Sequence, residues 1–151
     1  MRIIERAVDI QAPPAAVWQF LTDTDRYEDW NPFMPRLSGR LAAGERLTLT
    51  VRPGKRATTF RSTVLAVGDG AVIRWRGRLG VRGLVNGEHE LRLEPIPDGG
   101  TCFVQRETST GLSVPMMLRV LDDTATGFAA MNAALQDRAG SCAGEKEQLQ
   151  P

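Results

Sequence analysis

The 151-residue sequence has few of the residues that build disulfide frameworks and metal sites, because it contains only two cysteines and one histidine. Cys142 lies in "GSCAGEKEQLQP", a small and polar stretch, which argues against a structural disulfide to Cys102 and favours a cytoplasmic location. Two separated cysteines and the single histidine, His89, are too few for a zinc site. The sequence also contains no glycine-rich phosphate loop and no nucleophile motif, so we expect neither a metal nor a cofactor.

The sequence also has no excess of charge of one sign and no long apolar run. It holds 19 Lys and Arg against 18 Asp and Glu, a formal net charge of +1. This balance argues against a protein that binds the phosphate backbone of nucleic acids, so we expect no nucleic-acid partner. No apolar run reaches the length of a bilayer crossing, and charges interrupt the would-be signal-peptide core in "MRIIERAVDIQAPP". We therefore expect neither integral membrane association nor export by that route.

The remaining composition is typical of one globular domain. Hydrophobic residues make up 42% of the chain and charged residues 25%, which is enough apolar material for a substantial core. No internal repeat and no linker divides the chain. We assign residues 1–139 to a single domain and residues 140–151 to a disordered C-terminal tail, and the oligomeric state stays open.

Local patterns predict one strand and two short helices in the first part of the chain. β-branched residues with mixed alternation predict a strand over residues 2–11. Prolines suited to a first turn and apolar residues at helical spacing predict a helix over residues 12–23. A second, short helix is expected over residues 25–30, with Asp23 or Thr24 as its N-cap.

The second part of the chain reads as strands followed by a long helix. From about residue 37 to residue 109, alternating stretches separated by turns predict an antiparallel meander, with six or seven strands counting the first. Ser113 can then cap a helix with Pro115 in its first turn, about twenty-five residues long and spanning roughly 37 Å. Gly127 predicts a bend or a close backbone approach within it. One stripe carries its apolar residues: Met117, Leu121, Ala125 (or Thr124), Phe128, Met131, Leu135 and Ala139.

This order of elements, together with several sequence stretches, resembles the START/pollen-allergen-like (SRPBCC) superfamily. The likeness covers the chain from Arg2 to about Ala139 and is greatest to the bacterial polyketide cyclase/dehydrase-like branch. The pattern "AP..VW..L.D...Y..WNP" is fairly specific as a package. The stretches that carry the resemblance are "APPAAVWQFLTDTDRYEDWNPF", "IRWRGRL", "GEHELRLEP", "GGTCFVQRETSTGL" and "TGFAAMNAALQDRA".

The resemblance implies an α+β helix-grip fold, in which a curved antiparallel sheet wraps around a long C-terminal helix and leaves a hydrophobic cavity between them. It also implies that the protein binds an apolar small molecule, such as a lipid, a polyketide or a sterol-like compound. Only some members of the superfamily catalyse a reaction. The branch shares no catalytic signature that maps onto this chain, so the resemblance implies no catalytic residue here.

Alternation along the strands gives an independent interpretation of the two faces of the sheet. His89 shares the apolar face of its strand with two leucines, while glutamates and an arginine take the other face. Ile73 and Trp75 likewise share a face opposite three arginines. We therefore expect His89 and Trp75 to point inward, and the charged residues to form the outer face.

A hairpin between these two strands would pair their charges. If the chain turns near residues 80–81, Arg74 falls opposite Glu88 on the outside. Ile73 then falls opposite His89 on the inside. An outer ladder of arginine and glutamate keeps a sheet soluble and adds little stability. The alternative is a phosphate track with aromatic stacking platforms, but the acidic neighbours argue against it.

His89 and Glu107 are the candidate polar groups of the interior. Alternation does not decide which way Glu107 points, and the resemblance favours the interior or its mouth. A buried carboxyl group needs a partner or becomes neutral, so Glu107 and His89 can pair across adjacent strands. Such a pair can act as proton donor and acceptor in aldol-type cyclisation or dehydration. The simpler interpretation is a polar core contact or a group that orients a ligand.

Aromatic and sulfur-containing side chains are the candidate walls of the cavity. Methionines adapt to irregular volumes, which favours Met117 and Met131 of the long helix. Tyr27 has an apolar ring and a polar hydroxyl group, so we expect it at a partly solvent-exposed boundary. Trp18 and Trp30 are expected to anchor the short helices against the core. The full set of predicted ligand-binding residues is Phe33, Phe60, Trp75, His89, Glu107, Met117, Leu121, Phe128 and Met131.

Three functions are consistent with the sequence. The leading hypothesis is a binding protein for a hydrophobic or amphipathic small molecule, lipid-like or polyketide-like. The second is a cyclase or dehydratase that acts on a polyketide-like substrate through His89 and Glu107. The third is a protein-interaction or stress-response module with a filled core. An internal cavity, or its absence, separates the first two from the third.

Overall fold

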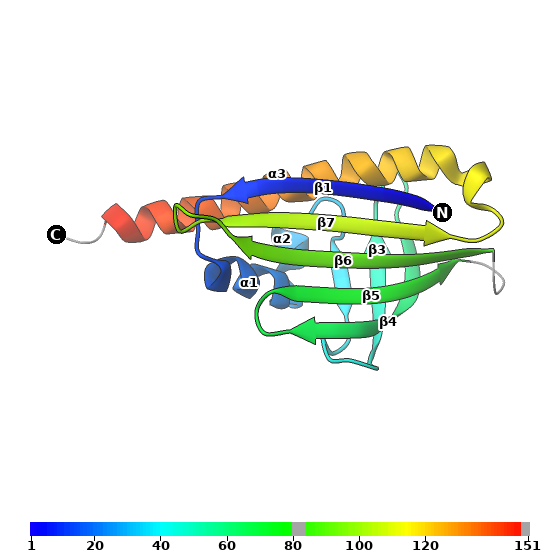
Figure 1. Cartoon of the computed structure of the whole chain (residues 1–151), viewed down its shortest axis with the longest axis horizontal. Coiled ribbons are helices and arrows are strands. Elements are labelled where there is room, and N and C mark those ends of the chain that lie inside the picture. Colours follow the sequence, from blue (N-terminus) through cyan, green and yellow to red (C-terminus); the bar gives the residue numbers. More distant parts are fainter. Residues whose placement is uncertain (80–83, 149–151) are drawn as a thin grey trace.

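A seven-stranded antiparallel sheet and a long C-terminal helix form most of residues 1–79 and 84–148, the part of the chain that this computed structural model describes (Figure 1). The strands are β1 (Arg2–Ile10), β2 (Arg36–Ser38), β3 (Arg46–Val51), β4 (Thr58–Gly68), β5 (Val72–Leu79), β6 (Val85–Pro95) and β7 (Thr101–Thr110). The helices are α1 (Pro14–Thr22), α2 (Tyr27–Trp30) and α3 (Leu118–Gln148), with 3-10 turns η1 (Thr24–Arg26) and η2 (Val114–Met117) before α2 and α3.

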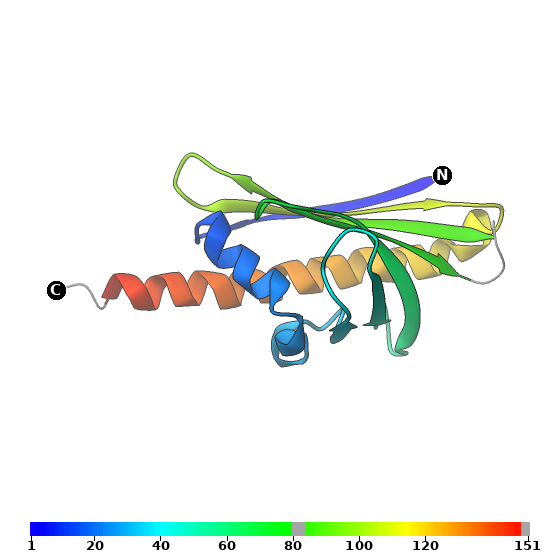
Figure 2. The ribbon, with the colours of Figure 1, turned by 90° about the horizontal axis from the view of Figure 1, so that it is seen from below.

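The sheet is curved and wraps around α3. Its strand order is β1-β7-β6-β5-β4-β3-β2, so every neighbour except β1 and β7 is a hairpin partner. The register of β4 against β5 shifts between Val64 and Ala66, and such an extra residue bends a strand. Figure 2 shows β1, β7 and β6 on one side of α3, while β3 and the first part of β4 turn around it. The predicted helix-grip fold is confirmed.

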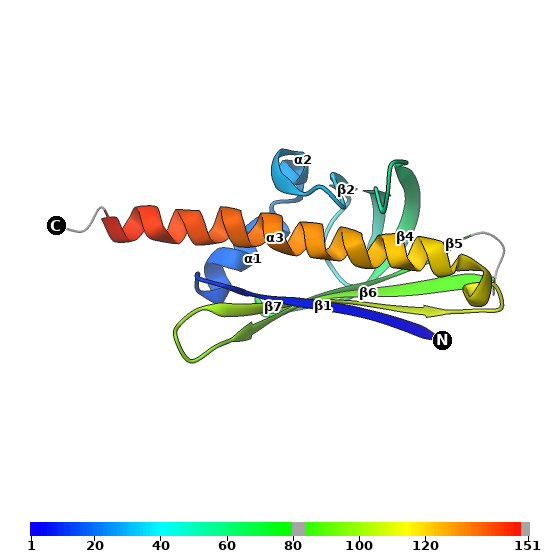
Figure 3. The same cartoon turned by 90° about the horizontal axis from the view of Figure 1, so that it is seen from above.

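Helix α3 lies along the concave face of the sheet, beside β1 (Figure 3). The buried side chains of Leu121, Phe128, Met131, Leu135 and Ala139 recur at helical spacing and face the core. The helix continues to Gln148, past Ala139, where the sequence analysis ended it. Residues 141–148 include alanine, glutamate, lysine and glutamine, which favour helix. Residues 149–151 lie outside the described part, and the division into domain and tail stays a prediction.

The short helices close one end of the concave face. α1 starts at Pro14 and buries Val17 and Leu21. The predicted side-chain cap of the second helix was wrong, because neither η1 nor α2 has a side-chain cap hydrogen bond. At the other end of α2, the side chain of Asn31 organises the chain that follows: its Oδ1 accepts hydrogen bonds from the main-chain N–H groups of Phe33 and Met34.

The aromatic residues of this segment face inward. Trp18 and Trp30 are partly buried and pack against the core, as predicted. The prediction that Tyr27 is partly exposed to solvent was wrong, because the residue is only 1% exposed. Its hydroxyl donates a hydrogen bond to the main-chain oxygen of Leu21, which satisfies the polar tip inside the core. Burial without a charged partner raises the pKa of Tyr27.

The faces of the β5–β6 hairpin were predicted correctly, but its register was shifted by two residues. Arg74 lies opposite Glu90 rather than Glu88, and His89 lies opposite Trp75 rather than Ile73. The turn expected at residues 80–81 lies outside the described residues, and strand pairing stops at Leu79 and Val85. A shift by two residues exchanges partners and keeps each side chain on its face.

The charged residues of this hairpin lie on the outer face of the sheet, as expected. The guanidinium groups of Arg74 and Arg76 lie 3.4 Å and 3.1 Å from the carboxylate of Glu88. Arg92 contacts Glu90 and Glu94 in the same way on the next strand. These arginines are therefore paired with carboxylates of the sheet itself.

Candidate functional site

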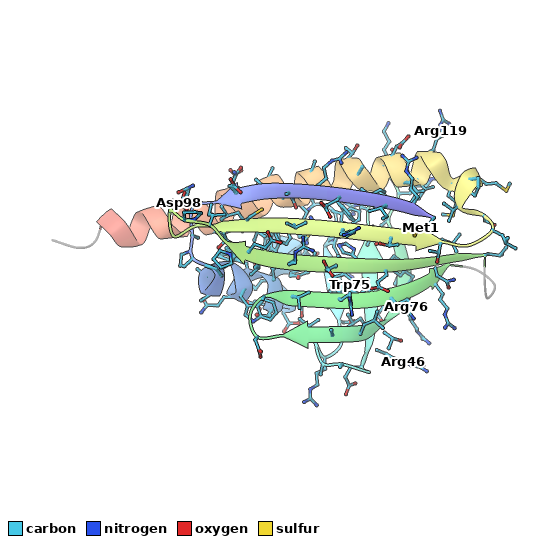
Figure 4. All side chains as sticks on the ribbon, viewed as in Figure 1. Met1, Arg46, Trp75, Arg76, Asp98 and Arg119 are labelled. Atoms are coloured by element: carbon cyan, nitrogen blue, oxygen red, sulfur yellow. The ribbon has the colours of Figure 1, made fainter. Side chains whose placement is uncertain are left out.

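A cavity of about 150 Å³ lies between the concave face of the sheet and the first half of α3. Its mouth lies where the lining residues reach the surface: Thr58 at the start of β4 and Val120 of α3 are exposed, and Pro53 and Thr124 beside them are half-buried. Figure 4 shows Arg119 at the end of the molecule where β7 leads to α3, and Asp98 at the opposite end. The cavity lies toward the Arg119 end, and this hollow does not agree with the filled core of an interaction module.

Eight of the nine predicted residues line this cavity, and the ninth does not. The eight are Phe33, Phe60, Trp75, His89, Glu107, Met117, Leu121 and Phe128. Met131 is fully buried in the core, where its sulfur accepts a hydrogen bond from the side-chain amide of Asn31. Three residues beyond Phe128 advance the helix by about 4.5 Å, which places Met131 past the cavity and beside the loop after α2.

A row of small residues crosses the sheet beside the cavity, and neighbouring side chains pack closely against it. Ser62, Gly77, Gly87 and Ser109 lie opposite one another on β4, β5, β6 and β7. A Cβ atom added at Gly77 would lie 2.9 Å from Ser62 Oγ and 3.3 Å from the Phe60 ring. The sequence analysis missed this row, although glycine inside a strand signals a close approach of other atoms.

The next row along the sheet carries the polar groups of the cavity. Trp75, His89 and Glu107 lie opposite one another on β5, β6 and β7. The ring of His89 is held between Trp75 and Phe128, with centroid distances of 4.8 Å and 4.9 Å. The carboxyl group of Glu107 lies directly against Gly87, where a Cβ atom would collide with Oε1.

Gln105 fixes the protonation pattern of His89. Its Nε2 donates hydrogen bonds to the main-chain oxygen of Phe128 at 3.3 Å and to Asn132 Oδ1 at 2.6 Å. Because a main-chain carbonyl only accepts, the amide nitrogen of Gln105 faces α3 and its Oε1 faces His89 Nε2, at 3.3 Å. Nε2 of His89 therefore carries the proton, and the lone pair of Nδ1 points toward Glu107. Gln105 lies two residues before Glu107 on β7, and the sequence analysis assigned it no role.

His89 and Glu107 lie side by side in the cavity, a question that the sequence left open. His89 Nδ1 lies 3.6 Å from Glu107 Oε2. Burial lowers the pKa of His89 to about 4, partly opposed by its hydrogen bond with Gln105. Burial, together with the charge of Glu88, raises the pKa of Glu107 to about 8. Both groups are therefore mainly uncharged at neutral pH, and the contact is a polar pair rather than an ion pair.

The rest of the described chain offers no alternative chemistry of the kinds considered from the sequence. Within residues 1–79 and 84–148, no group of three or more His, Cys, Asp or Glu side chains is placed to hold a metal ion. Cys102 is free and half-buried, and burial together with Asp9 and Glu94 raises the pKa of its thiol. No helix in this part of the chain combines the length and the apolarity that a membrane crossing requires.

The sequence matches the family described as polyketide cyclase / dehydrase and lipid transport over residues 1–140. The chain belongs to this family, and its likeness to the START-like superfamily is confirmed. No curated protein matches the sequence.

Solved structures with the same fold have low sequence identity to the chain. A protein from Mesorhizobium loti, MLL2253, is 21% identical with a TM-score of 0.72, over 90% of this chain and 95% of that one. The Zhui aromatase/cyclase from a Streptomyces species is 20% identical with a TM-score of 0.69, over 91% and 93%. A START superfamily protein from Mycobacterium smegmatis is 19% identical with a TM-score of 0.70, over 93% and 98%. At these identities the likeness establishes the fold alone.

Proposed function

We propose that this protein binds a hydrophobic or amphipathic small molecule, lipid-like or polyketide-like, in the cavity between α3 and the sheet. The cavity itself is the observation that carries the proposal, because its walls are mostly aromatic and aliphatic. Apolar pockets with a few convergent polar groups are the usual form of a small-molecule site. Here His89 and Glu107 would orient the ligand. A cytoplasmic location and the absence of a cofactor stay predictions.

Burial of apolar surface sets the affinity to expect. A single aromatic ring that hides roughly 150 Å² gains about 4 kcal/mol at about 25 cal/mol per Å². This free energy corresponds to a dissociation constant of about 1 mM. A larger ligand that also covers the mouth would bind more tightly. Ring-sized probes therefore need a method suited to weak binding, such as NMR titration.

The proposal is tested by blocking the mouth of the cavity. Thr124 borders the mouth, and Thr126 lies two residues later on an exposed part of α3. Both hydroxyls donate to the carbonyl four residues earlier, so the two positions are closely matched. We expect Thr124→Phe to weaken binding of toluene, fatty alcohols or aromatic polyketides at least tenfold, and Thr126→Phe to leave it unchanged. Native mass spectrometry and NMR titration without any bound species would remove the proposal.

A cyclase or dehydratase is the second candidate, and the contact between His89 and Glu107 favours it. Dehydration of a hydroxyketone needs a base to remove a proton and an acid to protonate the departing hydroxyl group. A neutral Glu107 can donate that proton, and Nδ1 of a neutral His89 can accept one. Alanine at either position should then abolish turnover of a polyketide-like substrate. Unchanged turnover in both variants would exclude this chemistry while leaving ligand binding intact.

A further inference from the structure

We propose that the cavity takes a ring-sized end of a ligand that carries an uncharged hydroxyl or carbonyl group, and that it excludes a carboxylate or an ammonium group. This inference rests on the proposed binding function and adds to it the chemical class of the buried group. It follows from the volume of the cavity, the charges around it and the free hydrogen-bonding capacity inside it.

The volume of the cavity limits the size of the buried part. A dry apolar cavity of about 150 Å³ in a protein interior accommodates a benzene ring. The present cavity has about this volume, and it opens to the surface beside Val120, a lining residue that is 45% exposed. One ring therefore fits inside, and any longer portion of the ligand would extend through the mouth.

The charges around the cavity disfavour an anionic group. The described residues that line it include no lysine and no arginine. Arg74 and Arg76 of β5 lie on the outer face, where Glu88 pairs with both. A ligand carboxylate would lose its water inside the cavity and lie beside the oxygens of Glu107 without a cation. Burial of an unpaired charge is costly, so such a ligand is rejected.

The hydrogen-bonding groups inside the cavity match an uncharged polar group. In the described part of the chain, Glu107 forms no hydrogen bond, because Nδ1 of His89 is 3.6 Å away, beyond hydrogen-bond distance. Gly87 leaves space for this carboxyl group to lie against the sheet. A protonated Glu107 can donate to a ligand carbonyl or hydroxyl oxygen, and its second oxygen can accept a hydroxyl proton. Its raised pKa keeps that proton present at neutral pH.

A ligand ammonium group is disfavoured for a different reason. It could form an ion pair with an ionised Glu107, but both charges would then lie in a largely apolar cavity. The cost of removing two charges from water is about as large as their attraction, so a buried pair of this kind gains little. A hydroxyl or carbonyl group avoids this cost and still forms a hydrogen bond.

Four ring-sized probes test the inference: toluene, phenol, benzoate and benzylamine, titrated at pH 7 and followed by NMR. We expect wild type to bind phenol at least as tightly as toluene, and to bind benzoate and benzylamine at least tenfold more weakly than phenol. Glu107→Leu should lower the affinity for phenol relative to toluene about tenfold. Glu107→Gln keeps an uncharged donor, so this ratio should stay within about threefold of wild type. Glu5→Gln, on the exposed part of β1, is the matched control and should change nothing.

The outcomes separate the inference from the proposed function. Benzoate or benzylamine binding as tightly as phenol would overturn the inference, and so would an unchanged ratio of phenol to toluene affinity in Glu107→Leu. In both cases toluene binding would leave the proposed function standing. Failure of all four probes to bind the folded wild type would overturn both the inference and the proposed binding function. If Glu107→Leu does not fold, the affinities of wild type and Glu107→Gln for phenol and benzoate still test whether the cavity prefers an uncharged group.

Discussion

The carboxyl group of Glu107 should make the protein less stable as the pH rises toward 8. Its pKa is about 8 in the folded protein, against an ordinary value of 4.5. Between these values the unfolded chain has lost this proton and the folded protein still holds it. Each pH unit in this interval lowers the free energy of unfolding by about 1.4 kcal/mol. The stabilisation is complete below pH 4.5 and is lost as the pH rises toward 8.

His89 acts in the opposite direction at lower pH. Its pKa is about 4 in the folded protein, against an ordinary value of 6.5. Its contribution to the stability of the folded protein is present above pH 6.5 and is lost as the pH falls toward 4, because the unfolded chain binds the proton at a higher pH than the folded protein does. The two effects nearly cancel between pH 4.5 and 6.5. From pH 6.5 to pH 8 the titration of Glu107 is no longer offset by that of His89. It should therefore lower the free energy of unfolding by about 2 kcal/mol over this range.

Urea unfolding at pH 6.5, 7.0, 7.5 and 8.0 checks this prediction. Glu107→Gln removes the titrating group and keeps its shape, so its stability relative to wild type should increase by about 2 kcal/mol across this range. For a chain of this length that change equals about 4–8 °C in Tm. The exposed Glu5→Gln should follow wild type at every pH. Parallel curves for wild type and Glu107→Gln would refute the buried, protonated state of Glu107.

Two further predictions concern packing. Gly127→Ala should destabilise the protein by about 1 kcal/mol in urea unfolding, because its Cβ atom would collide with the ring of Phe33 and this cost exceeds the gain in helix propensity. No atom lies within 4 Å of the Cβ position at Gly140, so Gly140→Ala should stabilise the protein by up to about 1 kcal/mol. Equal effects of the alanine substitutions at Gly127 and Gly140 would contradict the close packing of Gly127 against Phe33. Tyr27→Phe should cost about 1 kcal/mol in the same assay, because the main-chain oxygen of Leu21 loses its buried donor. No change in that variant would show that water satisfies this oxygen.

Local periodicity in the sequence predicted the strands, the helices and the inward faces well. Alternation placed His89 and Trp75 inside without any knowledge of partners, and helical spacing placed Leu121 and Phe128 on one stripe. The resemblance then supplied the arrangement of sheet and helix. The register of β5 against β6 was missed, because faces repeat every two residues and a shift by two leaves the pattern unchanged.

The details of the site depend on contacts between distant segments, which a sequence pattern does not encode. The role of Gln105 requires the carbonyl of Phe128 from α3 on one side and His89 on the other. The buried position of Tyr27 likewise depends on one carbonyl of α1. Met131 shares a stripe with residues that line the cavity, but it lies farther along α3, beside Asn31. Only the three-dimensional arrangement decides such cases.

The row formed by Ser62, Gly77, Gly87 and Ser109 ties the size of a ligand to its chemistry at one position. Gly87 belongs to this row, and the space that its missing side chain leaves holds the carboxyl group of Glu107 from the neighbouring row. A larger residue at Gly87 would therefore displace the group that hydrogen-bonds the ligand as well as reduce the space for it. Ligand size and ligand polarity are coupled through this one glycine.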